Sequence, residues 1–81
     1  MIKVYTVPDC KFCKDAKKYL KDHNIEFEEL NLKKKENRSA RAFYRSLGVK
    51  TAPIITGVDK NNDEWILVEY KEDELKKLLE I

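Results

Sequence analysis

The chain has 81 residues, of which 17 are Lys or Arg and 15 are Asp or Glu, so its formal net charge is only +2. This near balance of charge argues against a nucleic-acid-binding protein, which usually needs a concentrated basic face. No apolar run approaches the roughly 20 residues that cross a bilayer. A chain of this length forms one domain, residues 1–81, with a modest hydrophobic core. We therefore expect a monomer that binds neither nucleic acid nor membrane.

The first half of the chain predicts a strand, a helix and a second strand. Residues 2–7 alternate between apolar and polar side chains and are rich in β-branched residues, which favours a strand. From Lys11 onward, apolar residues recur every three to four positions, as on one face of a helix, until a stop signal at residues 22–24. Residues 26–32 then predict a second strand.

The second half predicts a helix, a strand pair and a final helix. The apolar residues of the second helix lie at i, i+3, i+4 and i+7: Ala40, Phe43, Tyr44 and Leu47. Gly48 follows as the residue that ends this helix. Residues 53–56 and 64–69 predict two strands, joined by the turn-rich segment 57–63. The segment from Lys71 is helical, with acidic residues in its first turn, where the helix dipole favours them.

The element order β-α-β-α-β-β-α predicts an α/β fold. A strand–helix–strand unit places its two strands in parallel through a right-handed crossover. The later strand pair is antiparallel, because a short turn joins its members. We expect a four-stranded mixed sheet flanked by three helices, with helices on both faces.

Two cysteines in the segment 9–14 stand where the first strand has ended and the first helix begins. At a helix start, unpaired backbone N–H groups and the helix dipole stabilise an anion, so the thiolate of Cys10 is favoured over the thiol. Lys11 and Lys14 act in the same direction, whereas Asp9 opposes them. We expect the thiolate to be favoured on balance.

The spacing of the two cysteines predicts separate roles for them. Two intervening residues on a first helical turn bring the sulfur of Cys13 within disulfide reach of Cys10. Cys10, at the tip, is expected to attack a substrate disulfide and form a mixed disulfide. Cys13, one turn in and partly covered, is expected to resolve it. The predicted catalytic residues are therefore Cys10 and Cys13.

Two other interpretations of the cysteine pair remain open at the level of sequence. A pair with this spacing is also half of a zinc site, which needs four ligands. His23 lies ten residues beyond Cys13, at the far end of the helix, so a metal site would need a second chain. The two cysteines could also be buried and inert, although a position at the helix start argues against burial of Cys10. We predict no metal site.

The chain resembles the glutaredoxins and, through them, the thioredoxin superfamily, over essentially its whole length. The likeness rests on Cys-Lys-Phe-Cys at 10–13 after the strand Val-Tyr-Thr at 4–6, and on Val-Lys-Thr-Ala-Pro-Ile-Ile at 49–55. The latter is similar to the family's Thr-Val-Pro segment, whose proline is cis and faces the cysteine pair. The resemblance implies a thioredoxin-like fold, thiol–disulfide oxidoreductase activity and a cis Pro53. An ordinary trans proline at the start of a strand is the alternative.

The resemblance also implies how substrates are bound. A cis proline turns the backbone so that Ala52 can offer its N–H and C=O to an extended substrate by strand-type pairing. Phe12 lies in the cysteine loop, where its ring would either contact a partner protein or simply pack. The expected partners are disulfide-containing proteins, with ribonucleotide reductase as one acceptor, because small redoxins of this build often serve it.

Several residues depart from the glutaredoxin pattern. The family's cysteine loop usually reads Cys-Pro-Tyr-Cys, whereas Lys11 and Phe12 stand here. The family's glycine pair before the last helix is absent, since residues 69–71 are Glu-Tyr-Lys. Val7 stands where many relatives carry a basic residue that helps to hold a glutathione carboxylate. Glutathione and a flavoprotein of the thioredoxin-reductase type therefore both remain open as electron donors, and we expect no permanently bound cofactor.

Glutathione is a small anionic peptide, so its binding site needs cations and backbone donors. The candidates are Lys11 and Arg38, with Glu72 and Asp73 at the start of the last helix facing its amino group. A non-enzymatic role is the competing interpretation: a thioredoxin-fold adaptor, or an iron–sulfur carrier in which Cys10 and glutathione share a cluster between two subunits. Cluster-carrying relatives favour a small residue after the first cysteine, and Lys11 is bulky.

The cysteine content and the N-terminal segment bear on location. The first residues, Met-Ile-Lys-Val-Tyr-Thr, are too short and too polar for the core of a signal peptide. Two cysteines are poorly explained as a structural disulfide framework, because cytosolic redox buffers keep such thiols reduced. We expect a cytoplasmic protein.

Overall fold

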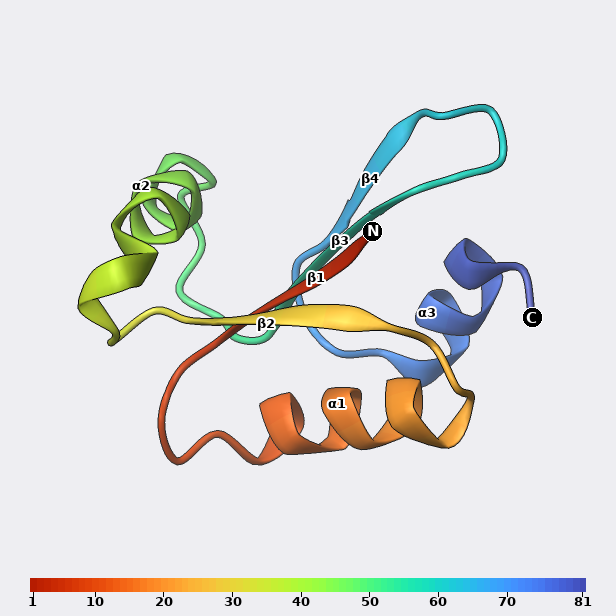
Figure 1. The fold of residues 1–81 in the computed structure, drawn as a ribbon, viewed down its shortest axis with the longest axis horizontal. Coiled ribbons are helices and arrows are strands. Elements are labelled where there is room, and N and C mark those ends of the chain that lie inside the picture. The colour runs from red at the N-terminus through yellow and green to blue at the C-terminus, as the bar shows by residue number, and fades with distance from the viewer.

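The computed structural model describes residues 1–81 and shows one sheet between two helical layers (Figure 1). Its four strands are β1 (Ile2–Thr6), β2 (Phe27–Asn31), β3 (Ile54–Val58) and β4 (Glu64–Leu67). Its α-helices are α1 (Lys11–Asp22), α2 (Arg38–Ser46) and α3 (Glu72–Leu79), and a short 3₁₀ helix, η1 (Lys35–Asn37), precedes α2. This order confirms the predicted succession of strands and helices.

The strand order in the sheet is β2-β1-β3-β4. Strands β1 and β2 are parallel and are joined through α1, whereas β3 is antiparallel to both β1 and β4. Tyr5, near the end of β1, lies opposite Ile54, the first residue of β3. The register therefore brings the segment that follows β1 next to the segment that precedes β3. Both segments belong to the candidate site.

The central strands are buried on both faces, because neighbouring residues of a strand point to opposite sides of a sheet. Val4 and Ile55, both 0% exposed, pack with the helices α1 and α3, whereas Tyr5 and Ile54 pack with α2. Each fully buried aliphatic side chain contributes about 1.5–3 kcal/mol to folding. Helices therefore cover both faces, as predicted, with α1 and α3 on one side and α2 on the other (Figure 1).

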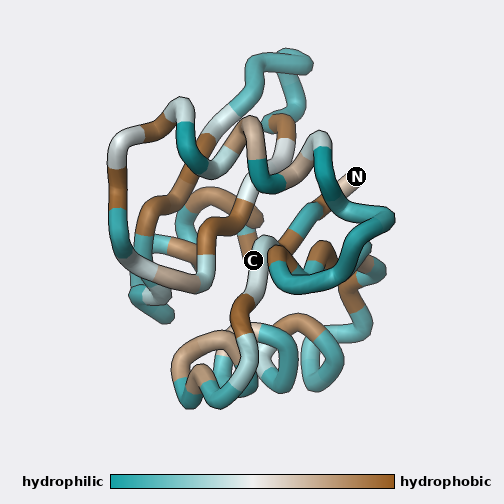
Figure 2. The backbone as a smooth tube through the Cα atoms, turned by 90° about the vertical axis from the view of Figure 1, so that its left-hand side faces the viewer, coloured by the Kyte–Doolittle hydropathy of each residue, from teal (hydrophilic) through white to brown (hydrophobic).

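Helix α1 begins where the sequence predicts, and α1 and α2 end where it predicts. In Figure 2 the tube of α1 alternates between hydrophobic and hydrophilic residues, as an amphipathic helix does. His23 follows α1 as its C-cap, and Asn24 takes a positive φ of 56°. Gly48 follows α2 with a φ of 68°, the left-handed conformation that glycine adopts without steric cost. None of the three α-helices is long and apolar enough to cross a membrane.

Strand β3 extends two residues beyond the predicted boundary at residue 56 and includes Gly57 and Val58. Gly57 lies opposite Trp65 of β4, and a Cβ atom placed on it would be 2.5 Å from the Trp65 ring and 2.7 Å from Ile2. The glycine therefore marks a close approach of an aromatic ring within a strand, not a turn. The prediction that the turn begins at residue 57 was wrong.

The other strand ends also differ from the sequence prediction: β1 ends at Thr6 instead of residue 7, β2 spans Phe27–Asn31 instead of residues 26–32, and β3 begins at Ile54 instead of residue 53. Strand β4 ends at Leu67 instead of residue 69, so Val68 lies in the connection to α3. The loop between β3 and β4 is organised by the side chain of Asp59, which accepts hydrogen bonds from the backbone N–H groups of Asn61 and Asp63. The 3₁₀ helix η1 was not predicted, because three polar residues show no hydrophobic periodicity.

Candidate active site

A disulfide joins Cys10 and Cys13 at the start of α1. Pro8 and Asp9 form a turn after β1, in which Asp9 has a φ of 56°, and Cys10 follows as the N-cap residue. The Cα atoms of the two cysteines are 5.2 Å apart. Cys13 is only 2% exposed, whereas Cys10 is half-buried. The structure confirms that the two sulfurs are within bonding reach and makes Cys10 the more accessible one.

The sulfur of Cys10 occupies the position of a helix-capping acceptor. The backbone N–H of Cys13 donates to Cys10 Sγ over 3.1 Å, and the N–H of Lys14 donates to the Cys10 carbonyl over 3.2 Å. A hydrogen bond from a backbone N–H is stronger to a thiolate than to a neutral sulfur. The helix start therefore favours the anionic form of Cys10 once the disulfide is reduced.

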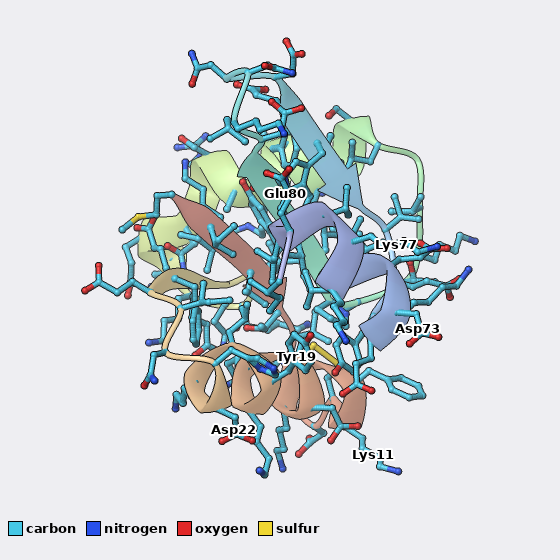
Figure 3. The ribbon with its side chains drawn as sticks, turned by 90° about the vertical axis from the view of Figure 1, so that its right-hand side faces the viewer. Lys11, Tyr19, Asp22, Asp73, Lys77 and Glu80 are labelled. Atoms are coloured by element: carbon cyan, nitrogen blue, oxygen red, sulfur yellow. A yellow bond between two sulfur atoms is a disulfide. The ribbon has the colours of Figure 1, made fainter.

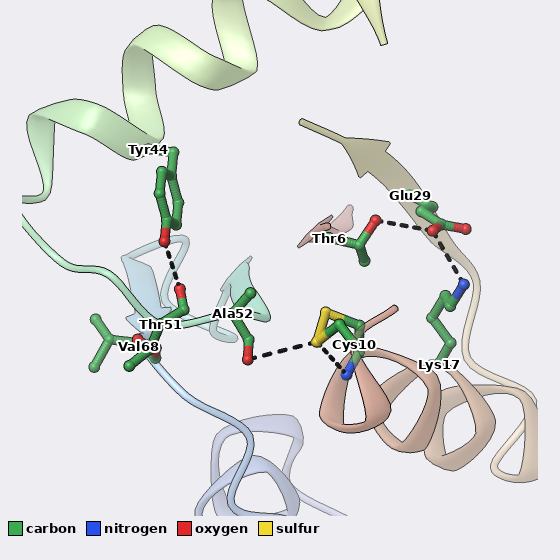
Figure 4. The surroundings of a disulfide bond; sticks show 9 residues. Thr6, Cys10, Lys17, Glu29, Tyr44, Thr51, Ala52 and Val68 are labelled. Carbon is green, nitrogen blue, oxygen red and sulfur yellow. Dashed lines mark hydrogen bonds and ion pairs between the residues drawn. A yellow bond between two sulfur atoms is a disulfide. The ribbon is translucent and has the colours of Figure 1, made fainter. Parts of the chain in front are cut away.

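The segment that precedes β3 forms the opposite wall of the site (Figure 4). The peptide bond between Ala52 and Pro53 is cis, as the family resemblance implied, and Pro53 is buried. The carbonyl oxygen of Ala52 lies 3.8 Å from Cys10 Sγ. No hydrogen bond within the chain engages the backbone N–H of Ala52. The residue whose carbonyl lies beside the Cys10 sulfur thus also has an unpaired backbone N–H.

Residues 2–61, well over half of the 81 residues, match the glutaredoxin family model. The chain belongs to the glutaredoxin family. With its cysteine pair in place, this glutaredoxin is a thiol–disulfide oxidoreductase.

Individual relatives match along nearly the whole chain. The chain is 35% identical over 80 residues to an uncharacterized glutaredoxin-like 8.6 kDa protein in the rubredoxin operon of Clostridium pasteurianum, with 99% of both covered. It is 31% identical over 78 residues to the glutaredoxin-like protein NrdH of Lactococcus lactis subsp. lactis, covering 96% of this chain and 99% of that one. The solved structure of the glutaredoxin-like protein NrdH-redoxin from Escherichia coli has a TM-score of 0.76 at 22% identity, covers 95% of this chain and 92% of that one, and supports the fold.

The two residues between the cysteines of this glutaredoxin face solvent. The Phe12 side chain is 58% exposed, so it does not pack into the core, and Lys11 is also exposed. Figure 3 shows Lys11 at the start of α1 and Asp73 on α3, both pointing outward from the protein. An exposed aromatic ring next to a reactive sulfur can contact a partner protein.

The structure separates the other candidates for glutathione binding. Arg38 begins α2 on one face of the sheet, whereas Glu72 and Asp73 begin α3 on the other. All three are exposed, and no ion pair or hydrogen bond links them to one another or to Lys11. Their role toward glutathione stays a prediction.

The zinc interpretation receives no structural support within one chain. The ring of His23 stacks on Tyr19 with a centroid distance of 4.2 Å, and its Nδ1 lies 2.8 Å from the Tyr19 carbonyl oxygen. His23 is thus engaged at the far end of α1, away from the cysteines. No group of three or more His, Cys, Asp or Glu side chains is placed to hold a metal ion.

A polar network that sequence analysis missed anchors α1 to the sheet (Figure 4). The hydroxyl of Thr6, a residue only 2% exposed, donates to Glu29 Oε2 over 2.9 Å. Lys17, one helical turn after Cys13, forms an ion pair with the same oxygen over 3.0 Å. Partial burial raises the pKa of Glu29, but hydrogen bonds from Lys17 and Thr6 and the charges of Lys17 and Lys34 lower it, and the pKa is lowered on balance.

We expect Glu29→Gln to remove a pH-dependent contribution to stability. Because the pKa of Glu29 is lower in the folded than in the unfolded state, the carboxylate stabilises the fold above its unfolded pKa, about 4.3, and this is lost as the pH falls through the folded value. The pair is partly exposed, so we expect a loss of about 0.5 kcal/mol. Urea unfolding should show this loss of unfolding free energy near pH ~7 and not near pH ~3. Equal losses at both pH values would contradict this assignment.

Proposed function

We propose that this glutaredoxin reduces protein disulfides, with Cys10 as the nucleophile and Cys13 as the resolving thiol. The difference in exposure between the two sulfurs carries this proposal. Cys10 is half-buried at the helix start and accepts a backbone hydrogen bond, whereas Cys13 is 2% exposed and behind it. A substrate disulfide can therefore reach Cys10 first.

The reaction consists of two thiol–disulfide exchanges that balance in atoms and electrons. The Cys10 thiolate attacks one sulfur of the substrate disulfide, forms a mixed disulfide and releases the other substrate sulfur as a thiolate. The Cys13 thiolate then attacks Cys10 Sγ and releases the second substrate thiolate. The substrate has gained two electrons and takes up two protons, and the enzyme ends with the Cys10–Cys13 disulfide of the structure.

The surroundings of the disulfide support a protein as the substrate. The free N–H of Ala52 and its carbonyl, 3.8 Å from Cys10 Sγ, offer strand-type pairing to an extended segment. The exposed Phe12 ring offers apolar contact area to a folded partner. We include ribonucleotide reductase among the acceptors and place the reaction in the cytoplasm, where reducing conditions return the pair to the dithiol.

We further propose that a flavoprotein of the thioredoxin-reductase type, not glutathione, supplies the electrons. Val7 is half-buried and offers no cation to a glutathione carboxylate. The segment that would carry the family's glycine pair has bulky side chains, and within it Lys71 forms ion pairs with Glu69 and Glu74 over 3.3 and 3.8 Å. The chain therefore lacks both the basic residue and the glycine pair on which glutathione binding in the family rests.

The proposal is tested by supplying NADPH with either thioredoxin reductase or glutathione plus glutathione reductase. We expect insulin disulfides to be reduced rapidly with the former and much more slowly with the latter, as measured by NADPH oxidation. Cys10→Ser is the control that subtracts direct reduction by each donor system. If the glutathione system is faster, the donor assignment is wrong. If neither system drives turnover, the reductase function itself is wrong.

A further inference from the structure

The loop beside the sulfur of Cys10 has no backbone–backbone hydrogen bonds to hold it in place. The segment from Val49 to Pro53 connects α2 to β3, and no backbone–backbone hydrogen bond begins or ends within it. Its two ends are fixed by packing. Pro53 is buried, and Val49 packs against the buried cluster of Tyr5, Leu32, Ala40 and Ile54. Between these ends, the hydrogen bonds that hold the backbone involve side chains.

Two side-chain hydrogen bonds converge on the residue before Ala52 (Figure 4). The hydroxyl of Tyr44, on α2, donates to the carbonyl oxygen of Thr51 over 2.9 Å. The hydroxyl of Thr51 donates to the carbonyl oxygen of Val68 over 2.6 Å. Thr51 is thus tied to a helix on one face of the sheet and to the residue that follows β4.

This arrangement matters for substrate binding because Ala52 comes next in the chain. Its carbonyl faces Cys10 Sγ, and its N–H is unpaired. Strand-type pairing depends on the position and direction of both groups, since a hydrogen bond weakens steeply once its angle falls below about 120°. A rotation of the Thr51 peptide would turn the N–H of Ala52 away from a substrate and leave the cysteines in place.

We propose that Tyr44 and Thr51 are positioning residues, which hold the backbone of Ala52 in the orientation that pairs with an extended peptide next to its disulfide. The inference rests on the proposed reduction of protein disulfides. Both hydroxyls act through the backbone and neither touches the reacting sulfurs. Their loss therefore affects substrates that present a peptide backbone and spares disulfides that have none.

The experiment compares Tyr44→Phe and Thr51→Val on two substrates. One is a linear peptide dimer joined by a single disulfide, and the other is 5,5′-dithiobis(2-nitrobenzoate), which has no peptide backbone. For each variant we expect kcat/KM to fall about fivefold on the peptide, mainly through a higher KM, as the loss of one hydrogen bond predicts. On the small disulfide we expect no change. The double variant should be weaker on the peptide than either single variant.

Matched controls separate positioning from folding. Tyr19→Phe and Thr56→Val remove hydroxyls for which the structure shows no hydrogen bond, and both residues lie outside the Val49–Pro53 segment. These controls should keep the wild-type kcat/KM on both substrates. Thermal unfolding of each variant shows whether it is folded at the assay temperature.

Each outcome decides a different statement. Wild-type protein that reduces neither substrate would overturn the proposed function. Wild-type protein that reduces both, with variants that lose equally on both or on neither, would overturn the positioning role and leave the function intact. A loss confined to the peptide substrate supports the positioning role.

Discussion

Cys10→Ser is expected to lower the reduction of protein disulfides by roughly a thousand-fold or more, as the removal of a nucleophile does in other enzymes. A serine hydroxyl at this position stays protonated near neutral pH and cannot replace the thiolate that the helix start stabilises. The measurement is insulin reduction with a chosen donor system. Thermal unfolding of the variant beside reduced wild-type protein controls for a change in fold. A variant that kept substantial activity would show that Cys13 attacks the substrate.

Alkylation of the reduced wild-type protein tests the same assignment without a mutation. Cys10 Sγ accepts the Cys13 N–H and is partly accessible, whereas Cys13 is 2% exposed. Iodoacetamide near neutral pH should therefore modify Cys10 first and faster than a free thiol, as shown by peptide mapping with mass spectrometry. Modification of Cys13 first, or of both at the rate of a free thiol, would contradict a stabilised thiolate at Cys10.

Cys13→Ser is expected to stop the reaction after the first exchange. The Cys10 thiolate still attacks a substrate disulfide, but no second thiol is in place to displace the product, so a mixed disulfide accumulates. Steady-state reduction of protein disulfides should fall about a hundred-fold or more, since only external thiols can complete the cycle. The release of the first substrate thiol in a single turnover should keep nearly the wild-type rate.

Non-reducing electrophoresis and mass spectrometry measure the trapped species. The covalent adduct should contain Cys10 and disappear on addition of dithiothreitol. The Cys10→Ser/Cys13→Ser double variant is the matched control and should form no adduct. If Cys13→Ser turned over protein disulfides at the wild-type rate, the resolving role of Cys13 would be wrong. The single cysteine would then be sufficient.

The sequence by itself determined the features that depend on local chemistry. The Cys-x-x-Cys pair at residues 10–13 follows a strand and begins a helix, and Cys10 caps that helix, because its Sγ accepts the N–H of Cys13, one of the N–H groups that any helix start leaves unpaired. Hydrophobic periodicity predicted the positions of the helices, and Gly48 and Asn24 lie where two of these helices end. These features follow from residues within one or two turns of each other.

The tertiary structure alone decided which distant residues meet. Thr6 contacts Glu29, 23 residues away, and Thr51 reaches Val68, 17 residues away. That the Ala52–Pro53 segment faces Cys10, 42 residues away, was expected from the family resemblance alone. The Thr6–Glu29 contact depends on the register of β1 and β2, because a one-residue change in register would turn the side chains of a strand to the other face. The Thr51–Val68 contact depends on where the segments before β3 and after β4 lie. For the same reason Gly57 resembled a turn residue in the sequence, although the ring of Trp65 requires a glycine there within a strand.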